Sequence, residues 1–141
     1  MTRLIRAALA ALTLTFAPLA AGLALADDRA DAIRNVIAQQ LDAFRADDWR
    51  RAYGYASPEI QRMFRNPGSF GRMVRGGYPM VWRPAEVETG PLIDGPDGPV
   101  QIMYFRDADG AHYVAAYEMK QVGGEWRIGG VKIRRTPQAS A

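Results

Sequence analysis

The side chains that most often carry out chemistry are sparse in this sequence. His112 is the single histidine, and there is no cysteine. One histidine cannot form a zinc site with cysteine or a second histidine, and no arrangement of serine, histidine and aspartate suggests a nucleophilic triad. His112 follows a predicted turn and begins a predicted strand, so we expect an exposed side chain. The residues therefore predict no metal site, no cofactor and no catalytic residue.

Carboxylates could still act as acid or base if they lay in an apolar pocket, because burial raises their pKa. The alternation of side chains along a strand tests this idea. Tyr117 and Met119 share the apolar face of a predicted strand, whereas Glu118 lies on the opposite face. Asp42 lies off the apolar face of the first predicted helix. Since no acid is expected to point inward, the pattern favours binding over catalysis.

Aromatic residues are the remaining candidates for a site, and six of them lie between Asp47 and Pro79. In a small domain most aromatic side chains must belong to the core. Tyrosine and tryptophan nevertheless carry polar groups that are awkward to bury. A pocket lined by some of them would suit a small apolar or aromatic ligand. The predicted pocket residues are Trp49, Tyr53, Phe70, Tyr78, Trp82, Tyr117 and Trp126, with Gln61 and Arg75 at the rim.

The segment Asp107-Ala108-Asp109-Gly110 has some of the residue types of a calcium loop. It lacks the remaining ligands and the distal glutamate of such a loop. Asp-Gly is common in hairpin connections. We therefore predict a turn.

Helices are expected to precede strands. In the first, the apolar residues follow a 3, 4, 4, 3 spacing, and Asp48, Ser57 and Ser69 are the expected caps of the helices that follow. Short helices with large apolar side chains are not stable alone, so they must pack against the strands. The predicted helices are Asp28–Ala46, Trp49–Ala56, Pro58–Arg65 and a last one after Ser69 that ends at Gly76-Gly77.

From Tyr78 onward the apolar residues alternate with a period of two, which predicts strands. In the last strand Ile128 and Val131 have opposite parity, so we predict a β-bulge at Gly129-Gly130. The segment Pro91–Pro99 contains three prolines and is expected to be a loop. The predicted strands are Met80–Arg83, Ala85–Gly90, Val100–Arg106, His112–Lys120 and Glu125–Ile133. Helices followed by an antiparallel sheet define an α+β class.

Residues 1–26 have the features of a cleaved signal peptide: Arg3 and Arg6, an apolar run, and a small-x-small end at Ala24-Leu25-Ala26. The alternative is an uncleaved membrane anchor, against which Pro18 and Gly22 argue. We expect an exported protein, periplasmic or secreted, with no membrane contact after cleavage. The formal net charge of +3 then falls to about +1. A protein that binds nucleic acid usually has clustered basic residues and a clear excess of positive charge. This sequence has neither, so we expect no binding to nucleic acid.

Several motifs together resemble one family. They are Gln40-Leu41-x-Ala43-Phe44, Asp47-Asp48-Trp49-x-x-Ala52-Tyr53, Ala56-Ser57-Pro58, Met73-Val74-Arg75-x-Gly77-Tyr78-Pro79 and Gly124-Glu125-Trp126-Arg127-Ile128. The chain resembles the DUF4864 family of small exported bacterial proteins, which is related to the NTF2-like superfamily. The resemblance implies helices packed into a curved sheet that forms a cone, often with a pocket at its open end. It implies no single activity.

The expected organisation is a signal peptide at 1–26, one NTF2-like domain at 27–134 and a disordered tail at 135–141. The expected function is non-catalytic binding of a small apolar or aromatic ligand. Alternatives are a protein-association module with a filled cone and an isomerase- or hydrolase-like enzyme. The segment Val100–Phe105 is apolar on both faces of its predicted strand. We therefore also expect a homodimer formed through the sheet.

Overall fold

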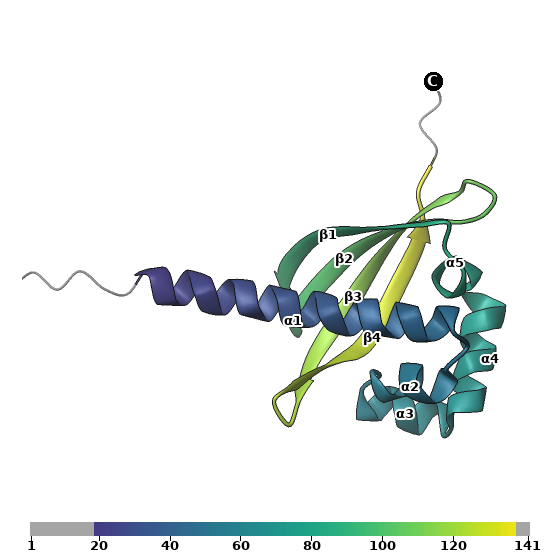
Figure 1. Cartoon of the computed structure of the whole chain (residues 1–141), viewed down its shortest axis with the longest axis horizontal. Helices are drawn as coiled ribbons and strands as arrows, with labels where there is room; N and C mark the ends of the chain where they lie inside the picture. The colour runs from purple at the N-terminus through teal and green to yellow at the C-terminus, as the bar shows by residue number, and fades with distance from the viewer. Residues whose placement is uncertain (1–18, 138–141) are drawn as a thin grey trace, which may run out of the picture.

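The chain folds as helices followed by an antiparallel sheet, which confirms the predicted α+β class. A computed structural model describes residues 19–137. Figure 1 shows the elements along the chain. In this range they are α1 (Leu19–Arg45), α2 (Trp49–Gly54), α3 (Pro58–Phe64), α4 (Pro67–Gly77), α5 (Pro79–Trp82), β1 (Glu86–Gly95), β2 (Gly98–Arg106), β3 (His112–Val122) and β4 (Glu125–Arg135).

Helix α1 begins at Leu19, before the predicted start at Asp28, and crosses one face of the sheet (Figure 1). Its predicted apolar face is confirmed, because Ile33, Ile37 and Leu41 are buried. The expected signal peptide lies mostly outside the described residues, which begin within it at residue 19. Leu25 is 70% exposed, and Ile33 is the first buried residue among the α1 side chains that the structure describes. Packing of α1 on the rest of the domain therefore involves its C-terminal part.

Polar caps set the starts of the short helices. The Asp48 side chain accepts a hydrogen bond from the backbone N–H of Arg51 (3.1 Å), which confirms its predicted capping role. Ser57 likewise caps α3. The predicted Ser69 cap is wrong: Asn66 caps α4 and accepts a hydrogen bond from Ser69 N–H at 2.8 Å. Proline directly follows the caps Ser57 and Asn66. Its fixed φ suits the first helical position, where a backbone N–H would have no partner within the helix.

The predicted strand at Met80–Arg83 is also wrong, because this segment forms the short helix α5. Pro79 stands at its first position, where a fixed φ favours a helical turn. The backbone N–H groups of Val81 and Trp82 donate to the Tyr78 carbonyl. With only a few residues between two turns, the apolar alternation was too short to distinguish a strand from one helical turn.

The four described strands form one antiparallel meander in the order β1-β2-β3-β4. The predicted loop at Pro91–Pro99 is wrong in its extent, since β1 continues to Gly95 and pairs with β2 up to Gly98. Pro91 is tolerated because it lies in the bulge between Thr89 and Leu92 of β1, which is an edge strand. The buried Gln101 side chain donates to the carbonyl of Gly90 at 2.8 Å.

The predicted bulge in the last strand is confirmed. Met119 pairs with Ile128 and Glu118 pairs with Gly130, so Gly129 is the extra residue. The bulge turns Ile128 and Val131 toward the same side of the sheet. Strand β4 continues to Arg135, and Thr136 N–H donates to the His112 carbonyl. Of the tail expected at 135–141, residues 138–141 lie outside the described range.

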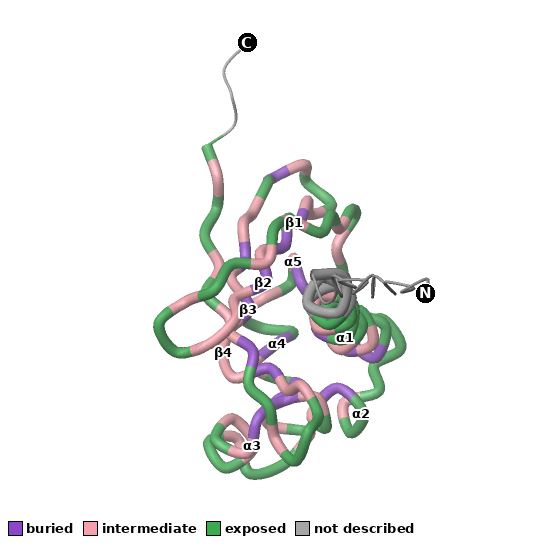
Figure 2. The backbone as a smooth tube through the Cα atoms, turned by 90° about the vertical axis from the view of Figure 1, so that its left-hand side faces the viewer, coloured by how far each residue is buried: buried purple, intermediate pink, exposed green. Residues whose placement is uncertain are grey.

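The core lies between the helices and the inner face of the sheet. Viewed along α1, the buried segments gather where the sheet faces α1 and α4 (Figure 2). The inner face of the sheet contributes Phe105, Ala115, Tyr117, Met119 and Ile128, all at most 2% exposed. The opposite face of the sheet is uncovered by any described helix (Figure 1).

Candidate functional site

An apolar cavity of about 340 Å³ lies between the helices and the inner side of β3 and β4. Its volume is in the range of about 300–1,000 Å³ that is usual for small-molecule sites. Residues from α1, α3 and α4 form one wall, and the C-terminal strand forms the other. The lining residues are Gln40, Phe44, Ala56, Ile60, Met63, Phe64, Phe70, Met73, Val74, Tyr78, Val81, Tyr117, Ile128, Gly129, Gly130, Val131 and Ile133.

The bulge in β4 shapes one wall of this cavity. Ile128 and Val131 both line it, and the two glycines between them line it as well. A Cβ atom on Gly130 would lie 3.0 Å from the Glu118 Oε2 atom on the outer side of the sheet. At Gly129 a Cβ atom would likewise lie 3.0 Å from the Lys120 side chain, so both glycines avoid close contacts with β3 side chains while the backbone of the bulge borders the cavity.

Three side chains with polar groups, Gln40, Tyr78 and Tyr117, lie in the otherwise apolar wall. Gln40 is 4% exposed, and its Nε2 group donates to the Ala52 carbonyl at 3.1 Å, which joins α1 to α2. Tyr117 is 1% exposed, and its hydroxyl has no hydrogen-bond partner among the described residues. Burial raises the pKa of the Tyr117 hydroxyl far above its usual value, so the group stays protonated.

No acidic or basic side chain is among the described residues that line the cavity. The part of the chain that the structure covers also holds no group of three or more histidine, cysteine, aspartate or glutamate residues that could bind a metal ion. Proton transfer by a buried carboxylate has no described group to carry it at this position. The cavity offers shape, apolar surface and the hydroxyl-bearing side chains of Tyr78 and Tyr117.

A short bridge fixes the helical wall to the sheet beside the bulge. Ser57 N–H donates to the Ile128 carbonyl, and Ile128 N–H donates to the Tyr55 carbonyl, both at 2.8 Å. These bonds form an isolated parallel bridge between Ala56 and Ile128. The junction of α2 and α3 and the middle of β4 are thereby held together at the edge of the cavity.

Of the nine residues that the sequence analysis placed at a pocket, three line this cavity. They are Phe70, Tyr78 and Tyr117. Phe70 lies at the centre of an aromatic cluster, within 5.7 Å of the rings of Tyr53 and Phe64 (centroid to centroid). The other six predicted residues are not among the lining residues, and each has a different local role.

Tyr53 and Gln61 bond to each other across α2 and α3. The Tyr53 hydroxyl donates to the Gln61 carbonyl, and the Gln61 amide donates to the Tyr53 carbonyl at 3.0 Å. Both side chains are therefore occupied in joining two short helices. They border a shallow depression on the outer side of α3 with Arg62 and Arg65.

Trp49 and Arg75 also pair with each other. The Arg75 guanidinium lies 5.5 Å from the Trp49 ring centroid, a cation–π contact. The other side of Trp49 faces the helices: its ring lies 5.9 Å from that of Phe44. A Cβ atom on Gly71 would lie only 2.6 Å from the Trp49 Cδ2 atom. This tryptophan is therefore part of the packing between α1, α2 and α4.

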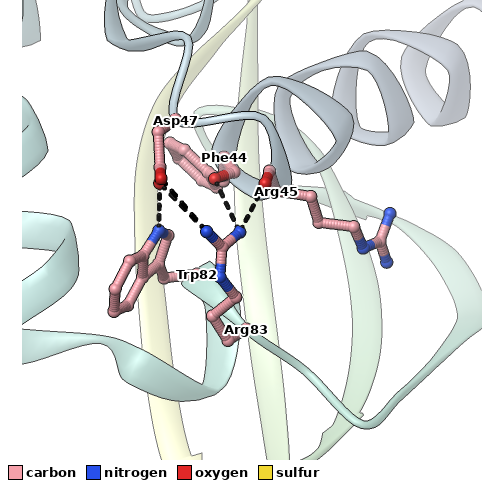
Figure 3. Close-up of polar contacts among 5 residues, drawn as sticks. All are labelled: Phe44, Arg45, Asp47, Trp82 and Arg83. Atoms are coloured by element: carbon pink, nitrogen blue, oxygen red, sulfur yellow. Dashed lines mark hydrogen bonds and ion pairs between the residues drawn. The ribbon is translucent and has the colours of Figure 1, made fainter.

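Trp82 takes part in a polar cluster at the C-terminal end of α1 (Figure 3). Its Nε1–H group donates to Asp47 Oδ1 at 2.8 Å. Arg83 donates to both carboxylate oxygens of Asp47 and to the carbonyls of Phe44 and Arg45, the last carbonyls of the helix. A cation at a helix C-terminus is also favoured by the helix dipole. This cluster closes the end of α1.

Trp126 lies near the start of β4, beside a separate groove. Residues of α1 and of the turn after α2 also line this groove. His112 is exposed at the start of β3, as predicted. The predicted turn at Asp107–Gly110 is confirmed: Asp107 Oδ1 accepts hydrogen bonds from the backbone N–H groups of Asp109 and Ala111 at 3.0 and 2.9 Å.

The sequence analysis missed most of the aliphatic and thioether wall. Ile60, Met63 and Phe64 are spaced so that they share one side of α3, and this spacing could have identified them. In α4, Met73 and Val74 follow Phe70 by three and four positions, so the three residues share one side of that helix. Nothing in the type of these residues distinguishes a cavity wall from a filled interior.

The fold and cavity together define a small α+β protein with one apolar cavity between helices and sheet, in the part of the chain that the structure covers. Residues 26–141 match the model of a family described as a domain of unknown function, DUF4864. The chain belongs to this family. Neither a curated protein nor a solved structure matches it. None of the helices in the described range is long and apolar enough to cross a membrane.

Proposed function

We propose that this protein binds a small apolar or aromatic ligand, without catalysis, in the cavity between α3, α4 and β4. The observation that carries the proposal is the composition of the cavity: about 340 Å³ lined mainly by apolar side chains, with the buried and unpartnered hydroxyl of Tyr117 in its wall. Apolar cavities with a few polar groups are the usual form of small-ligand sites. An NTF2-like cone, to which the family resemblance points, would place such a site at its open end.

Binding is tested with N-phenyl-1-naphthylamine, a neutral dye whose fluorescence rises in apolar surroundings. We expect saturable binding of one dye per chain. Val131→Phe, which enlarges a half-buried side chain in the wall, should weaken binding at least tenfold. Val122→Phe is the matched control, since Val122 is half-buried near the end of β3 and does not line the cavity. Equal binding by both variants would contradict the proposal.

We further propose that the protein is exported, with residues 1–26 removed. Supporting this, Arg29 of α1, which lies after residue 26, forms an ion pair with Asp94 of β1 at 3.1 Å, and Leu25 is largely exposed. Removal of residues 1–26 would leave these contacts intact. Mass spectrometry of the protein from a bacterial periplasmic fraction should give a chain beginning at Asp27. A full-length chain in the cytoplasmic fraction would contradict export.

A second candidate function is association of two copies through the outer face of the sheet. Val100, Ile102 and Tyr104 alternate with buried residues along β2, and Tyr104 is 41% exposed. Two ion pairs, Glu86 with Arg106 and Glu118 with Lys132, lie on the same face at 3.1 Å each. Because both charge signs are present, a twofold-related copy could place opposite charges together around the apolar centre.

Sedimentation of the protein at high micromolar concentration tests this association. We expect a dimer for the wild type and a monomer for Tyr104→Glu, because a dimer would bury the new charge. Met63→Glu is the control, since Met63 is 72% exposed and lies in α3, away from the sheet. A monomeric wild type would overturn the association candidate and leave ligand binding untouched.

A further inference from the structure

The buried Tyr117 hydroxyl is the feature of the cavity that its packing does not explain. A phenol with no partner loses its hydrogen bonds to water and regains none within the protein, at a cost of about 1–3 kcal/mol. Phenylalanine would fill nearly the same space without this cost. Tyr117 nevertheless stands in the cavity wall, fully buried.

No described side chain bonds to the Tyr117 hydroxyl. Gln101 is its direct partner across β2 and β3. The Gln101 amide nitrogen donates to the carbonyls of Gly90, Pro91 and Ile102, and its Oε1 atom has no partner among the described residues either. The amide nitrogen of Gln40 donates to Ala52. Neither side chain satisfies the Tyr117 hydroxyl.

We propose that the ligand is an uncharged, mainly apolar molecule with an oxygen acceptor, and that this oxygen accepts a hydrogen bond from the Tyr117 hydroxyl. This inference rests on the proposed function and narrows the class of ligand. A carbonyl or ether oxygen on a flat ring system satisfies the hydroxyl and fills the apolar space. The hydroxyl is the specificity-determining group of the site.

Charge is disfavoured because the wall holds no opposite charge. The described lining residues include no arginine, lysine or carboxylate, and burial keeps Tyr117 neutral. A carboxylate in this cavity would lose its hydration without an ion pair in return. A neutral acceptor loses much less on leaving water.

Access to the hydroxyl requires the wall to move, because its oxygen is covered in this structure. Met63 and Met73 both line the cavity, and Met63 is 72% exposed. Thioether side chains change rotamer readily and adapt to a ligand.

Three probes of similar shape test whether the cavity prefers a neutral oxygen acceptor, no acceptor or a negative charge. 2-Acetylnaphthalene carries a neutral carbonyl, 2-isopropenylnaphthalene replaces its oxygen with CH2, and 2-naphthoate carries a negative charge. Dissociation constants come from displacement of N-phenyl-1-naphthylamine, for the wild type and Tyr117→Phe. Circular dichroism and thermal melting of the variant establish that it is folded.

We expect the wild type to bind the acetyl probe about 2- to 13-fold more tightly than the isopropenyl probe, the range for one neutral hydrogen bond. Naphthoate should bind most weakly. In Tyr117→Phe the preference for the carbonyl should disappear, while the isopropenyl probe keeps its affinity within about twofold.

Equal affinity of the wild type for the acetyl and isopropenyl probes would overturn this inference but leave apolar binding standing. If Tyr117→Phe keeps the preference for the carbonyl probe, a group other than the Tyr117 hydroxyl causes that preference. This result would also overturn the inference. Tight binding of naphthoate would contradict the neutral ligand class. Failure of the dye and all three probes to bind would overturn both this inference and the proposed function.

Discussion

Asp47 and Arg83 form an ion pair between the end of α1 and the segment after α5, with Oδ2 and Nη2 3.1 Å apart (Figure 3). Asp47 has a positive φ of 51°, which an aspartate tolerates better than most residues. The backbone turns sharply there, and the carboxylate then accepts from Arg83 and Trp82. The pair links segments 36 residues apart in sequence.

Arg83→Ala should lower the free energy of unfolding by about 1–2 kcal/mol, since it removes a partly exposed ion pair and two bonds to helix carbonyls. Urea unfolding followed by circular dichroism measures this. Arg83→Lys keeps the charge but cannot form the fork, so it should recover less than half of the loss. Full recovery by lysine would show that charge alone matters and that the forked contacts contribute nothing.

Gly71 and Gly76 lie in the same helix but in different surroundings. Gly71→Ala should destabilise the protein by about 1–3 kcal/mol, because the new Cβ would overlap the Trp49 ring. Gly76→Ala meets nothing within 4 Å and should stabilise the helix by up to about 1 kcal/mol. Urea unfolding and tryptophan fluorescence of both variants check this contrast. Similar effects of the two substitutions would mean that Trp49 moves aside freely.

Asp107 gives the stability a defined pH dependence. The Ala111 backbone N–H, followed by the Tyr113 hydroxyl, holds the pKa of the Asp107 carboxyl below its usual value. Its folded pKa is therefore lower than its pKa of about 3.9 in the unfolded chain. The stabilisation is complete above the unfolded pKa and is lost as the pH falls through the folded pKa.

The melting temperature of Asp107→Asn should consequently lie below that of the wild type at pH 7. The difference should shrink as the pH falls below about 4, when the wild-type carboxyl becomes protonated. Thermal melts from pH 7 to pH 2 measure this trend. A difference that stays constant over the whole range would show that the charge of Asp107 contributes no stability.

Tyr117→Phe should be at least as stable as the wild type, because it removes a buried hydroxyl that has no described partner. Most substitutions of a buried aromatic side chain destabilise, so this direction is distinctive. Chemical unfolding without ligand measures it. Tyr113→Phe is a useful comparison, since the Tyr113 hydroxyl donates to Asp107 at 3.2 Å and its removal should cost stability. A clear loss in Tyr117→Phe would point to a partner for the hydroxyl.

Local signals in the sequence predicted much of the fold. The apolar spacing of α1, the Asp48 and Ser57 caps and the bulge at Gly129 each depend on neighbouring residues, and each is confirmed. The errors arose where distant residues decide the structure. Gln101 bonds to the Gly90 and Pro91 carbonyls at the bulge in β1, and no local rule for prolines could have indicated this.

The cavity was less predictable than the fold. Tyr117 was identified because strand parity turned it inward and its hydroxyl is hard to bury. Trp82 was placed at the pocket for the same reason, but Asp47, 35 residues earlier, accepts its N–H group outside the cavity. The polar group of a buried tyrosine or tryptophan predicts that it has a hydrogen-bond partner. It does not predict whether that partner is protein or ligand.

The bridge between Ala56 and Ile128 consists of backbone bonds alone. Substituting the surrounding side chains does not delete them, provided that the chain keeps its path. The cavity wall can therefore be redesigned at Ile60, Met73 or Val131 while the junction of α2 and α3 stays anchored to β4. The backbone bonds that hold the fold are therefore separate from the side chains that select a ligand. For protein engineering, this separation makes the chain a starting point for binders of new small molecules.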